Sequence, residues 1–393
     1  MHTNKNYYWR IAGFYFFYYA FIGMFAPYWS LYLKSIHFDA VEISILLSVQ
    51  PVMRMIAPNL WGWLADHTGK RLYVLKIAAT LSAVFYMGVF FTTSFWGMLA
   101  VLALMSFFWS ASMPLVEATT LSYLGKHSTR YGRIRSWGSI GFIMTVVGLG
   151  YAFDHIAIAW LLWAGLVCEV GILLFSRQIP HTEVAAHHTD TLPIKQIVFK
   201  PRVLALLGAC FCMSMAHGPY YTFYSIYLVD HGYSKSAIGG LWALGVICEI
   251  AVFFVMPWLA NRYGYTRILL VSFACAVVRF LMIGWYVDML LILLIAQVLH
   301  AATFGAYHAA SVGLVHEFFK GRHQAKGQAL FGSLTYGAGG MVGGLASGPL
   351  WERLGAPMMF SASALAALMG LALMIWKLRS QLRDTKMLNS TPV

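Results

Sequence analysis

The stretch at residues 62–71 reads Gly-Trp-Leu-Ala-Asp-His-Thr-Gly-Lys-Arg, and it separates two long apolar runs. Its two glycines allow a tight turn and a close approach of neighbouring helices. The carboxylate of Asp66 can face a helix N-terminus, and the basic pair that ends the stretch can face carbonyl groups or lipid phosphates. The flanking runs, at about 40–64 and 73–92, are each long enough to cross a bilayer. The stretch therefore predicts a short charged loop between two membrane-spanning helices.

The rest of the chain repeats this alternation. Of its 393 residues, 60% are hydrophobic and only 10% are charged, whereas soluble domains carry about 25% charged residues. Apolar runs of about 20 residues, each enough for one span, occur at 9–33, 40–64, 73–92, 96–124, 133–153, 157–176, 203–229, 236–259, 268–287, 290–318, 326–349 and 356–377. We therefore predict an all-α membrane protein of twelve transmembrane helices. We expect an N-terminal six-helix bundle at 1–176, a cytoplasmic linker at 177–202, and a C-terminal six-helix bundle with a tail at 203–393.

The basic residues are distributed unevenly between the loops. The formal net charge is +13, yet one set of alternate loops holds only Lys34, Lys235 and Arg353. An excess of Lys and Arg in the remaining loops is typical of the cytoplasmic side, so both termini are expected in the cytoplasm. The charge then sets orientation in a bacterial inner membrane, and nucleic acid is not an expected partner. The five cysteines lie within apolar runs and form no CxxC pair, so neither a disulfide nor a metal site is expected.

The two halves of the chain resemble each other. Residues 29–33 (Trp-Ser-Leu-Tyr-Leu) match residues 224–228 (Tyr-Ser-Ile-Tyr-Leu), and residues 64–69 match residues 259–264 at the same spacing. Parallel repeats of this kind place a substrate site at their interface, near the middle of the membrane. The same spacing makes Arg54 the counterpart of Glu249. The predicted architecture is therefore two pseudo-symmetric bundles around a central site.

Residues 62–71 resemble the signature loop of the major facilitator superfamily. In that superfamily the loop is a latch between conformations, and the resemblance implies this role for Gly62, Asp66, Gly69 and Arg71. Residues 131–142 (Tyr-Gly-Arg-Ile-Arg-Ser-Trp-Gly-Ser-Ile-Gly-Phe) are similar to a segment of the phenylpropionate permease family, which is related to nucleoside–proton symporters and lactose permease. Further similarity to this family covers 216–221, 232–234, 241–249, 277–279 and 297–310. It implies the major facilitator fold, whereas it fixes the cargo less well because members differ in substrate.

Polar residues within the spans are the candidate site residues, because a lone charge in a bilayer is costly. Helical spacing places them on common faces, for example His300, Phe304 and His308 at i, i+4 and i+8. The expected substrate-binding residues are Gln50, Arg54, His217, Tyr220, Tyr221, Trp242, Arg279 and Phe304. The expected proton-coupling residues are Glu117, Glu249, His300 and His308, since buried carboxyl and imidazole groups can exchange protons near physiological pH.

Each of these residues also has a purely structural interpretation. Arg54, Glu249 and Arg279 could form a static buried ion pair, whose breakage costs about 3–5 kcal/mol. The imidazoles of His300 and His308 could serve only as structural hydrogen-bonding groups. Glu169 lies in a span that packs peripherally in this fold, and a structural role is expected for it.

No nucleotide-binding, metalloprotease or nucleophile-elbow pattern occurs in the sequence, which favours an ion gradient over ATP and a transporter over an enzyme. We expect a monomeric symporter without a cofactor that moves a small organic solute, such as an aromatic or other organic acid, together with protons by alternating access. The alternatives are uptake of a nucleoside, sugar or siderophore, proton-driven efflux of amphipathic compounds, a membrane receptor and a membrane-embedded enzyme.

Overall fold

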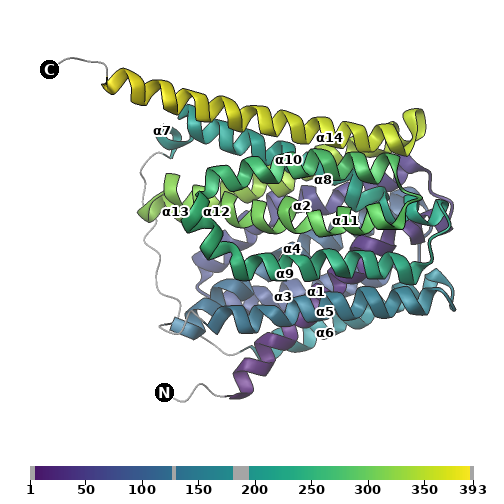
Figure 1. The fold of residues 1–393 in the computed structure, drawn as a ribbon. Coiled ribbons are helices and arrows are strands. Elements are labelled where there is room, and N and C mark those ends of the chain that lie inside the picture. The colour runs from purple at the N-terminus through teal and green to yellow at the C-terminus, as the bar shows by residue number, and fades with distance from the viewer. Residues whose placement is uncertain (1–4, 126–129, 180–193, 390–393) are drawn as a thin grey trace. The chain divides into compact units, whose positions relative to one another are not determined.

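Helices make up every regular element in the residues that the computed structural model describes, which are 5–125, 130–179 and 194–389 (Figure 1). This confirms the predicted all-α class. The long helices before the linker are α1 (Lys5–Ser35), α2 (Ala40–Thr68), α3 (Arg71–Tyr86), α4 (Phe95–Leu124), α5 (Tyr131–Phe153) and α6 (Leu161–Gln178). After it come the short α7 (Lys195–Val198), then α8 (Pro201–Asp230), α9 (Lys235–Tyr263), α10 (Tyr265–Trp285), α11 (Leu290–His300), η4 (Ala301–Ala306), α12 (Tyr307–Phe318), α13 (Gln324–Gly332), η6 (Ser333–Gly339) and α14 (Gly340–Asn389).

Local sequence explains where α2 begins and ends. Asp39 accepts a hydrogen bond from the backbone N–H of Glu42, and the Glu42 side chain accepts one from the backbone N–H of Asp39. This reciprocal pair satisfies donors that the first turn of a helix leaves open. At the other end Gly69 has φ 64°, a left-handed conformation that glycine adopts without steric cost. The helix therefore stops inside the charged stretch that the sequence marks as a loop.

Most of these helices are long enough to span a membrane. In the described part of the chain, eleven helices are long and apolar enough to cross a membrane. The last of them covers Gln324–Trp376 and contains Gly355 at φ 77° and ψ 171°, where two helices meet at a kink. Division at Gly355 gives the twelve spans predicted from the sequence. The boundary between the predicted spans 326–349 and 356–377 coincides with this glycine.

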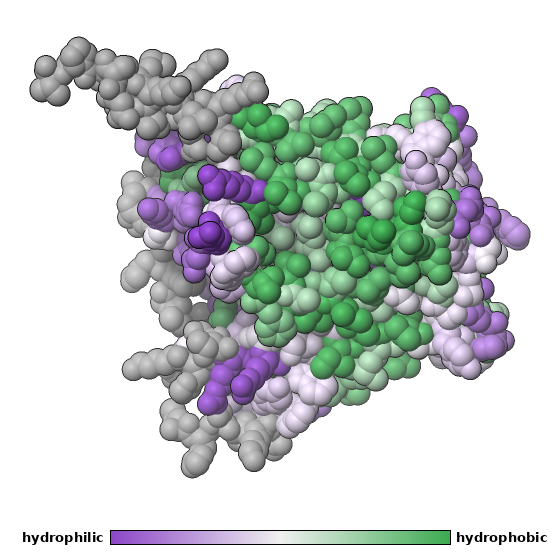
Figure 2. Space-filling model, in the orientation of Figure 1, coloured by the Kyte–Doolittle hydropathy of each residue, from purple (hydrophilic) through white to green (hydrophobic). Residues whose placement is uncertain are grey.

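Apolar side chains cover the middle of the helices on the face drawn in Figure 2, and hydrophilic residues gather at the helix ends. Large apolar residues are strongly exposed, including Phe254 at 82% and Leu291 at 68% of their surface. A water-soluble protein rarely exposes contiguous apolar surface of this kind, whereas lipid solvates it. The surface therefore agrees with a multi-pass membrane protein.

The chain forms two compact units. The first comprises the described residues of 1–188 together with Tyr221–Ala243, which belong to α8 and α9. The second comprises the described residues of 189–220 together with those of 244–393. Most of the expected linker at 177–202 lies outside the described residues, so the predicted division of the chain at this linker stays a prediction.

Within the first unit, polar contacts tie the ends of α5 and α9 together. The Asp154 carboxylate, just after α5, accepts hydrogen bonds from the backbone N–H groups of Lys235 at 2.8 Å and Ser236 at 3.1 Å. The pKa of Asp154 lies below its ordinary value, mainly because the Ser236 side chain donates a hydrogen bond to the carboxylate, with the two backbone donors adding to this. Lys34 and Asp230 form an ion pair at 2.5 Å in the same unit. These contacts connect segments that are far apart in the sequence.

Candidate substrate and proton site

A fully buried guanidinium lies within the second unit. Arg279 on α10 donates from Nε to the backbone oxygen of Ala296 at 3.0 Å. Its Nη1 lies 3.5 Å from Thr303 Oγ1, and its guanidinium carbon lies 4.3 Å from the centre of the Tyr220 ring. Its Nη2 has no hydrogen-bond partner among the described residues. A buried cation with an unused donor is a group that an anionic ligand can satisfy.

His217 on α8 faces this guanidinium in a defined tautomer. Its Nδ1 lies 2.9 Å from the backbone oxygen of Met213, so Nδ1 carries the hydrogen of that bond. Its Nε2 lies 3.4 Å from Nη1 of Arg279. Arginine can only donate, so His217 Nε2 accepts and the imidazole is neutral. His217 therefore orients Arg279 and is not the proton carrier in this arrangement.

A second imidazole pairs with a carboxyl group. Nε2 of His300, at the end of α11, lies 2.7 Å from Oε1 of Glu249 on α9, and the two side chains are only 6% and 12% exposed. Two lone pairs would repel each other at this separation, so at least one proton lies between the imidazole and the carboxyl. His300 Nδ1 has no hydrogen-bond partner among the described residues. The pair is thus a buried position that must hold a proton on either of two groups.

The absence of a side chain at Gly245 on α9 makes room for this pair. A Cβ atom at position 245 would lie 3.0 Å from Cδ2 of His300 and 3.3 Å from Oε1 of Gln297. Both distances are shorter than ordinary van der Waals contact. The glycine therefore lets α9 approach α11 closely enough for Glu249 to reach His300.

Aromatic rings extend the site along η4. His300 stacks on Phe304 with 5.4 Å between ring centres, and Phe304 stacks on His308 at 6.5 Å. His308 Nδ1 lies 2.7 Å from the hydroxyl of Tyr336 on η6. Both η4 and η6 are π-helical, a conformation found often at functional sites. The structure therefore brings together three residues that the sequence placed on one helical face.

Two polar residues of this cluster are absent from the site predicted from the sequence. Gln297 accepts a hydrogen bond from the Tyr220 hydroxyl at 3.1 Å, and Thr303 lies beside Arg279. Both residues are fully buried, and each lies three positions from His300 in the sequence, about one helical turn away. Their polarity within a highly apolar run is the signal that could have identified them. In the described part of the chain, no three His, Cys, Asp or Glu side chains gather in a group that could hold a metal ion.

Tyr221 and Trp242, two further predicted substrate residues, belong to the first unit. Their rings lie 5.9 Å apart, and the indole N–H of Trp242 donates to Ser225 Oγ at 3.2 Å. The predicted substrate residues of α8 are therefore divided between the two units, with His217 and Tyr220 in the second and Tyr221 in the first.

Arg54 and Gln50 on α2 also belong to the first unit. The Arg54 guanidinium lies 5.8 Å from the ring centre of Trp109 on α4, and Trp109 stacks on Tyr18 at 4.3 Å with 10° between the planes. Gln50 lies one helical turn before Arg54 and is half-buried. Tyr18 and Trp109 were missed because an aromatic residue in an apolar run carries no mark of the direction it faces. Convergence of Arg54 with Arg279 and Glu249 on one cavity stays a prediction.

Glu117 on α4 accepts a hydrogen bond from the Tyr131 hydroxyl at 3.1 Å. Nearby in the same unit, Arg135 on α5 donates to the Tyr19 hydroxyl, and its guanidinium lies 3.8 Å from the centre of that ring. Arg135 lies near the start of α5, which begins at Tyr131. Tyr19 on α1, Glu117 on α4 and Arg135 on α5 therefore belong to a second group of charged and aromatic residues in this unit.

The predicted latch residues lie at the end of α2 and the start of α3. Arg71 Nη2 is 3.7 Å from Asp66 Oδ1, with the two side chains 11% and 63% exposed. Gly69 supplies the left-handed turn between them, and a Cβ at Gly62 would meet no neighbouring atom within 4 Å. A local ion pair, weakened by the exposure of Asp66, thus connects the two ends of the loop, and the role of the loop as a latch stays a prediction.

Comparisons with known proteins address the family directly. The MFS_1 like family matches residues 8–362 of this chain. The chain is 28% identical to the probable 3-phenylpropionic acid transporter of Escherichia coli (strain K12), over 88% of this chain and 92% of that protein. It is 25% identical to the maltose permease of Geobacillus stearothermophilus, over 86% of each chain. A crystal structure of a mutant of the nucleoside transporter NupG matches with a TM-score of 0.82 at 18% identity, covering 95% of this chain and 99% of that one.

The family match spans nearly all of the twelve predicted helices, and the structural match extends over the same range. Both agree with the resemblance inferred from the stretches at 62–71 and 131–142, which is thereby confirmed. The similar proteins are transporters and not enzymes. The chain therefore belongs to the MFS_1 like family and is a multi-pass membrane transporter with the major facilitator fold.

Proposed function

We propose that this transporter is a proton-coupled symporter that takes up a small organic acid, with an aromatic acid as the first candidate. The observation that carries the proposal is the His300–Glu249 contact at 2.7 Å, in the same unit as the buried guanidinium of Arg279 with its unused Nη2 donor. The His300–Glu249 pair can hold a proton, and Arg279 can hold an anion. Their presence in one buried cluster is the basis for coupling.

The chemistry of each group assigns its role. A carboxylate ligand accepts a hydrogen bond from Nη2 of Arg279, and the charge-assisted bond is worth about 1.5–3 kcal/mol. Glu249 and His300 hold the transported proton and release it on the other side of the membrane. A monovalent anion and one proton together carry no net charge, so the loaded carrier crosses without working against the membrane potential.

An aromatic ring fits the surroundings of these charged groups. Tyr220 and Phe304 each contribute a ring beside the cluster, with Tyr220 against Arg279 and Phe304 against His300. Offset or edge-to-face contact with such rings is worth about 0.5–1.5 kcal/mol beyond burial. The first-named relative is a probable 3-phenylpropionic acid transporter, whose cargo combines a ring with a carboxylate. This makes 3-phenylpropionate the first substrate to test.

The remaining roles follow from the same scheme. The remaining substrate contacts come from Gln50, Arg54, Tyr221 and Trp242. Further proton-coupling groups are Glu117 and His308. Gly62, Asp66, Gly69 and Arg71 form the latch between conformations. The protein acts as a monomer in a bacterial inner membrane with both termini in the cytoplasm, and a proton gradient is its energy source in place of a cofactor.

Uptake into proteoliposomes tests this proposal. Purified protein is reconstituted, and accumulation of labelled 3-phenylpropionate is measured with and without an inward proton gradient. Gradient-driven accumulation is the expected result, and accumulation that ignores the gradient would exclude symport. Parallel assays with a nucleoside, a sugar and a siderophore identify a different cargo, and transport only in the outward direction would indicate efflux of amphipathic compounds.

A further inference from the structure

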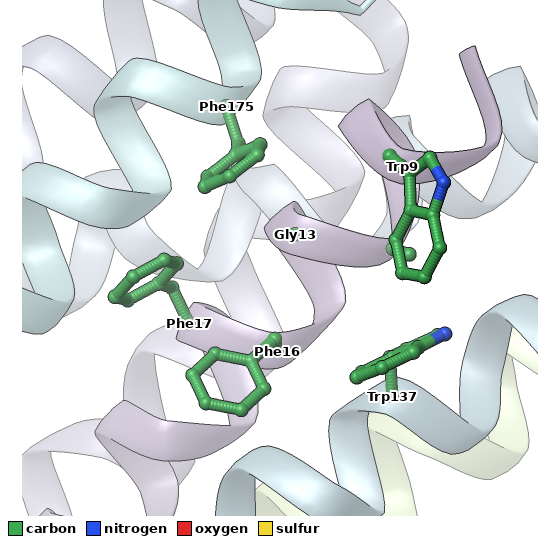
Figure 3. Close-up of a pocket in the computed structure, with 7 residues that line it drawn as sticks. Trp9, Gly13, Phe16, Phe17, Trp137 and Phe175 are labelled. Atoms are coloured by element: carbon green, nitrogen blue, oxygen red, sulfur yellow. The ribbon is translucent and has the colours of Figure 1, made fainter. Parts of the chain in front are cut away.

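An apolar groove of about 260 Å³ opens on the first unit between α1, α5 and α6. It is lined by the rings of Trp9, Phe16, Phe17, Trp137 and Phe175, and by Gly13, against which the Phe175 ring packs (Figure 3). Phe17 and Phe175 stack at 5.6 Å, and Trp9 meets Trp137 edge-on at 5.3 Å. From Trp9 to Phe17 the groove follows α1 for about 12 Å, at about 1.5 Å per residue.

The groove begins near one end of these three helices. Trp9 lies near the start of α1, Trp137 near the start of α5, and Phe175 near the end of α6. In Figure 3 the nitrogen atoms of Trp9 and Trp137 lie at the end away from Phe17. The indole N–H of Trp137 donates to the Tyr8 hydroxyl at 3.0 Å. Tryptophan and tyrosine are enriched at membrane–water interfaces, where one end of the ring is apolar and the other polar.

Two arginines lie at this polar end. Arg10 shares a helix stripe with Gly13 and Phe17 at i, i+3 and i+7, and its Nη1 donates to the backbone oxygen of Gln178 at the end of α6. Arg133 is exposed, lies one turn before Trp137, and accepts from the Tyr8 hydroxyl through its backbone oxygen at 3.3 Å. Neither guanidinium has a carboxylate partner within 4.0 Å among the described residues.

We propose that this groove, with Arg10 and Arg133 at its rim, binds one anionic phospholipid, whose acyl chain lies along the aromatic rings and whose phosphate lies at the arginines. Orientation of the protein in the membrane explains basic residues at this end of the helices, but it does not explain an aromatic hollow beside them. The two arginines attract a negatively charged headgroup, and the aromatic groove accepts an acyl chain. Together they favour an anionic phospholipid as the ligand. The site is independent of the proposed transport cycle because it uses none of the cluster around Arg279.

Native mass spectrometry of the purified full-length protein tests this inference by titration with phosphatidylglycerol and with phosphatidylcholine of the same acyl chains. Each arginine near a membrane surface favours an anionic lipid by roughly fivefold in affinity. Preference for phosphatidylglycerol is therefore expected to be about 25-fold, and to disappear in Arg10→Gln/Arg133→Gln. Arg133→Gln alone changes an exposed side chain and is expected to lower the preference roughly fivefold, which keeps the test valid if the double variant does not fold.

The matched control removes two exposed arginines on either side of Gly264, one at the end of α9 and one at the start of α10, as Arg262→Gln/Arg267→Gln. It carries the same loss of charge and is expected to keep the preference for phosphatidylglycerol. Equal binding of the two lipids by the unaltered protein, or equal loss in both double variants, would overturn the proposal. A photoreactive acyl chain locates the lipid: labelling of peptides around Phe16, Trp137 and Phe175 is expected, whereas labelling confined to other helices would contradict the groove as the site.

Discussion

Glu249→Gln separates proton coupling from binding most directly, because glutamine keeps the shape of the side chain but cannot carry the transported proton. The pair with His300 spans 2.7 Å and is 6% and 12% exposed, so solvent screens it little. A hydrogen bond to a charged group is worth about 1.5–3 kcal/mol, and glutamine retains part of it. The loss of folding stability should therefore stay below about 3 kcal/mol, and the protein should remain folded.

The coupling effect has a thermodynamic scale of its own. One proton moving down a gradient of about one pH unit supplies about 1.4 kcal/mol, which supports about a tenfold accumulation of a monovalent acid. The unaltered protein should approach this ratio in proteoliposomes when labelled 3-phenylpropionate is supplied outside them. Glu249→Gln should give a ratio near one while still exchanging labelled for unlabelled substrate in counterflow. Glu352→Gln removes an exposed carboxyl on α14 and serves as the control. A folded Glu249→Gln protein that still accumulates substrate tenfold would refute Glu249 as the proton site.

Three further substitutions probe other contacts. Arg279→Gln should weaken binding of 3-phenylpropionate by roughly 10–100-fold and abolish its preference over the uncharged amide, as measured by calorimetry; a retained preference would exclude Arg279 as the anion partner. Gly245→Ala should push His300 away from Glu249 and reduce gradient-driven uptake. Gly240→Ala is the control, because a Cβ there meets no described atom within 4 Å, and it should leave uptake unchanged. Equal effects of the two substitutions would contradict the role of space at Gly245. Asp154→Ala should speed hydrogen exchange at the Lys235 and Ser236 amides roughly fivefold, as loss of a helix cap does, and Asp154→Asn should have a smaller effect. The pKa of Asp154 is lowered, so its contribution is fully present above its ordinary value of about 3.9 and is lost only as pH falls through the lowered one; a change in exchange between pH 5 and 8 that depends on Asp154 would contradict this.

Hydrophobic pattern predicted the spans well because lipid imposes one requirement on every helix, which is enough apolar length. Helix ends were less predictable: α1 reaches Ser35 and α2 reaches Thr68, beyond the apolar runs that end near 33 and 64. Polar residues can continue a helix outside the hydrocarbon, since its backbone hydrogen bonds stay satisfied there. Apolar length alone therefore marks the segment in lipid and not the whole helix.

The candidate site was only partly predictable. Spacing within one helix placed His300, Phe304 and His308 on a common face, but it carries no information about Glu249, which comes from another helix. Arg135 was not among the predicted site residues, because a basic residue in the first turns of a span has the same sequence pattern as a loop charge. Helix-to-helix pairing depends on tertiary packing, and periodicity within a single helix does not contain it.

The π-helical turn at η4 sets how the two imidazoles are aligned. An ideal α-helix turns about 100° per residue, so side chains four apart fan out by about 40° at each step. Rings at 300, 304 and 308 nevertheless lie nearly parallel, with 19° and 13° between successive planes. The wider π-helical turn changes the angular step between these positions, and the side-chain torsions of each ring set the remaining tilt. If η4 tightened to ordinary helix, the positions of His300, Phe304 and His308 around the helix would shift, and the contact of His308 with Tyr336 would have to change with them.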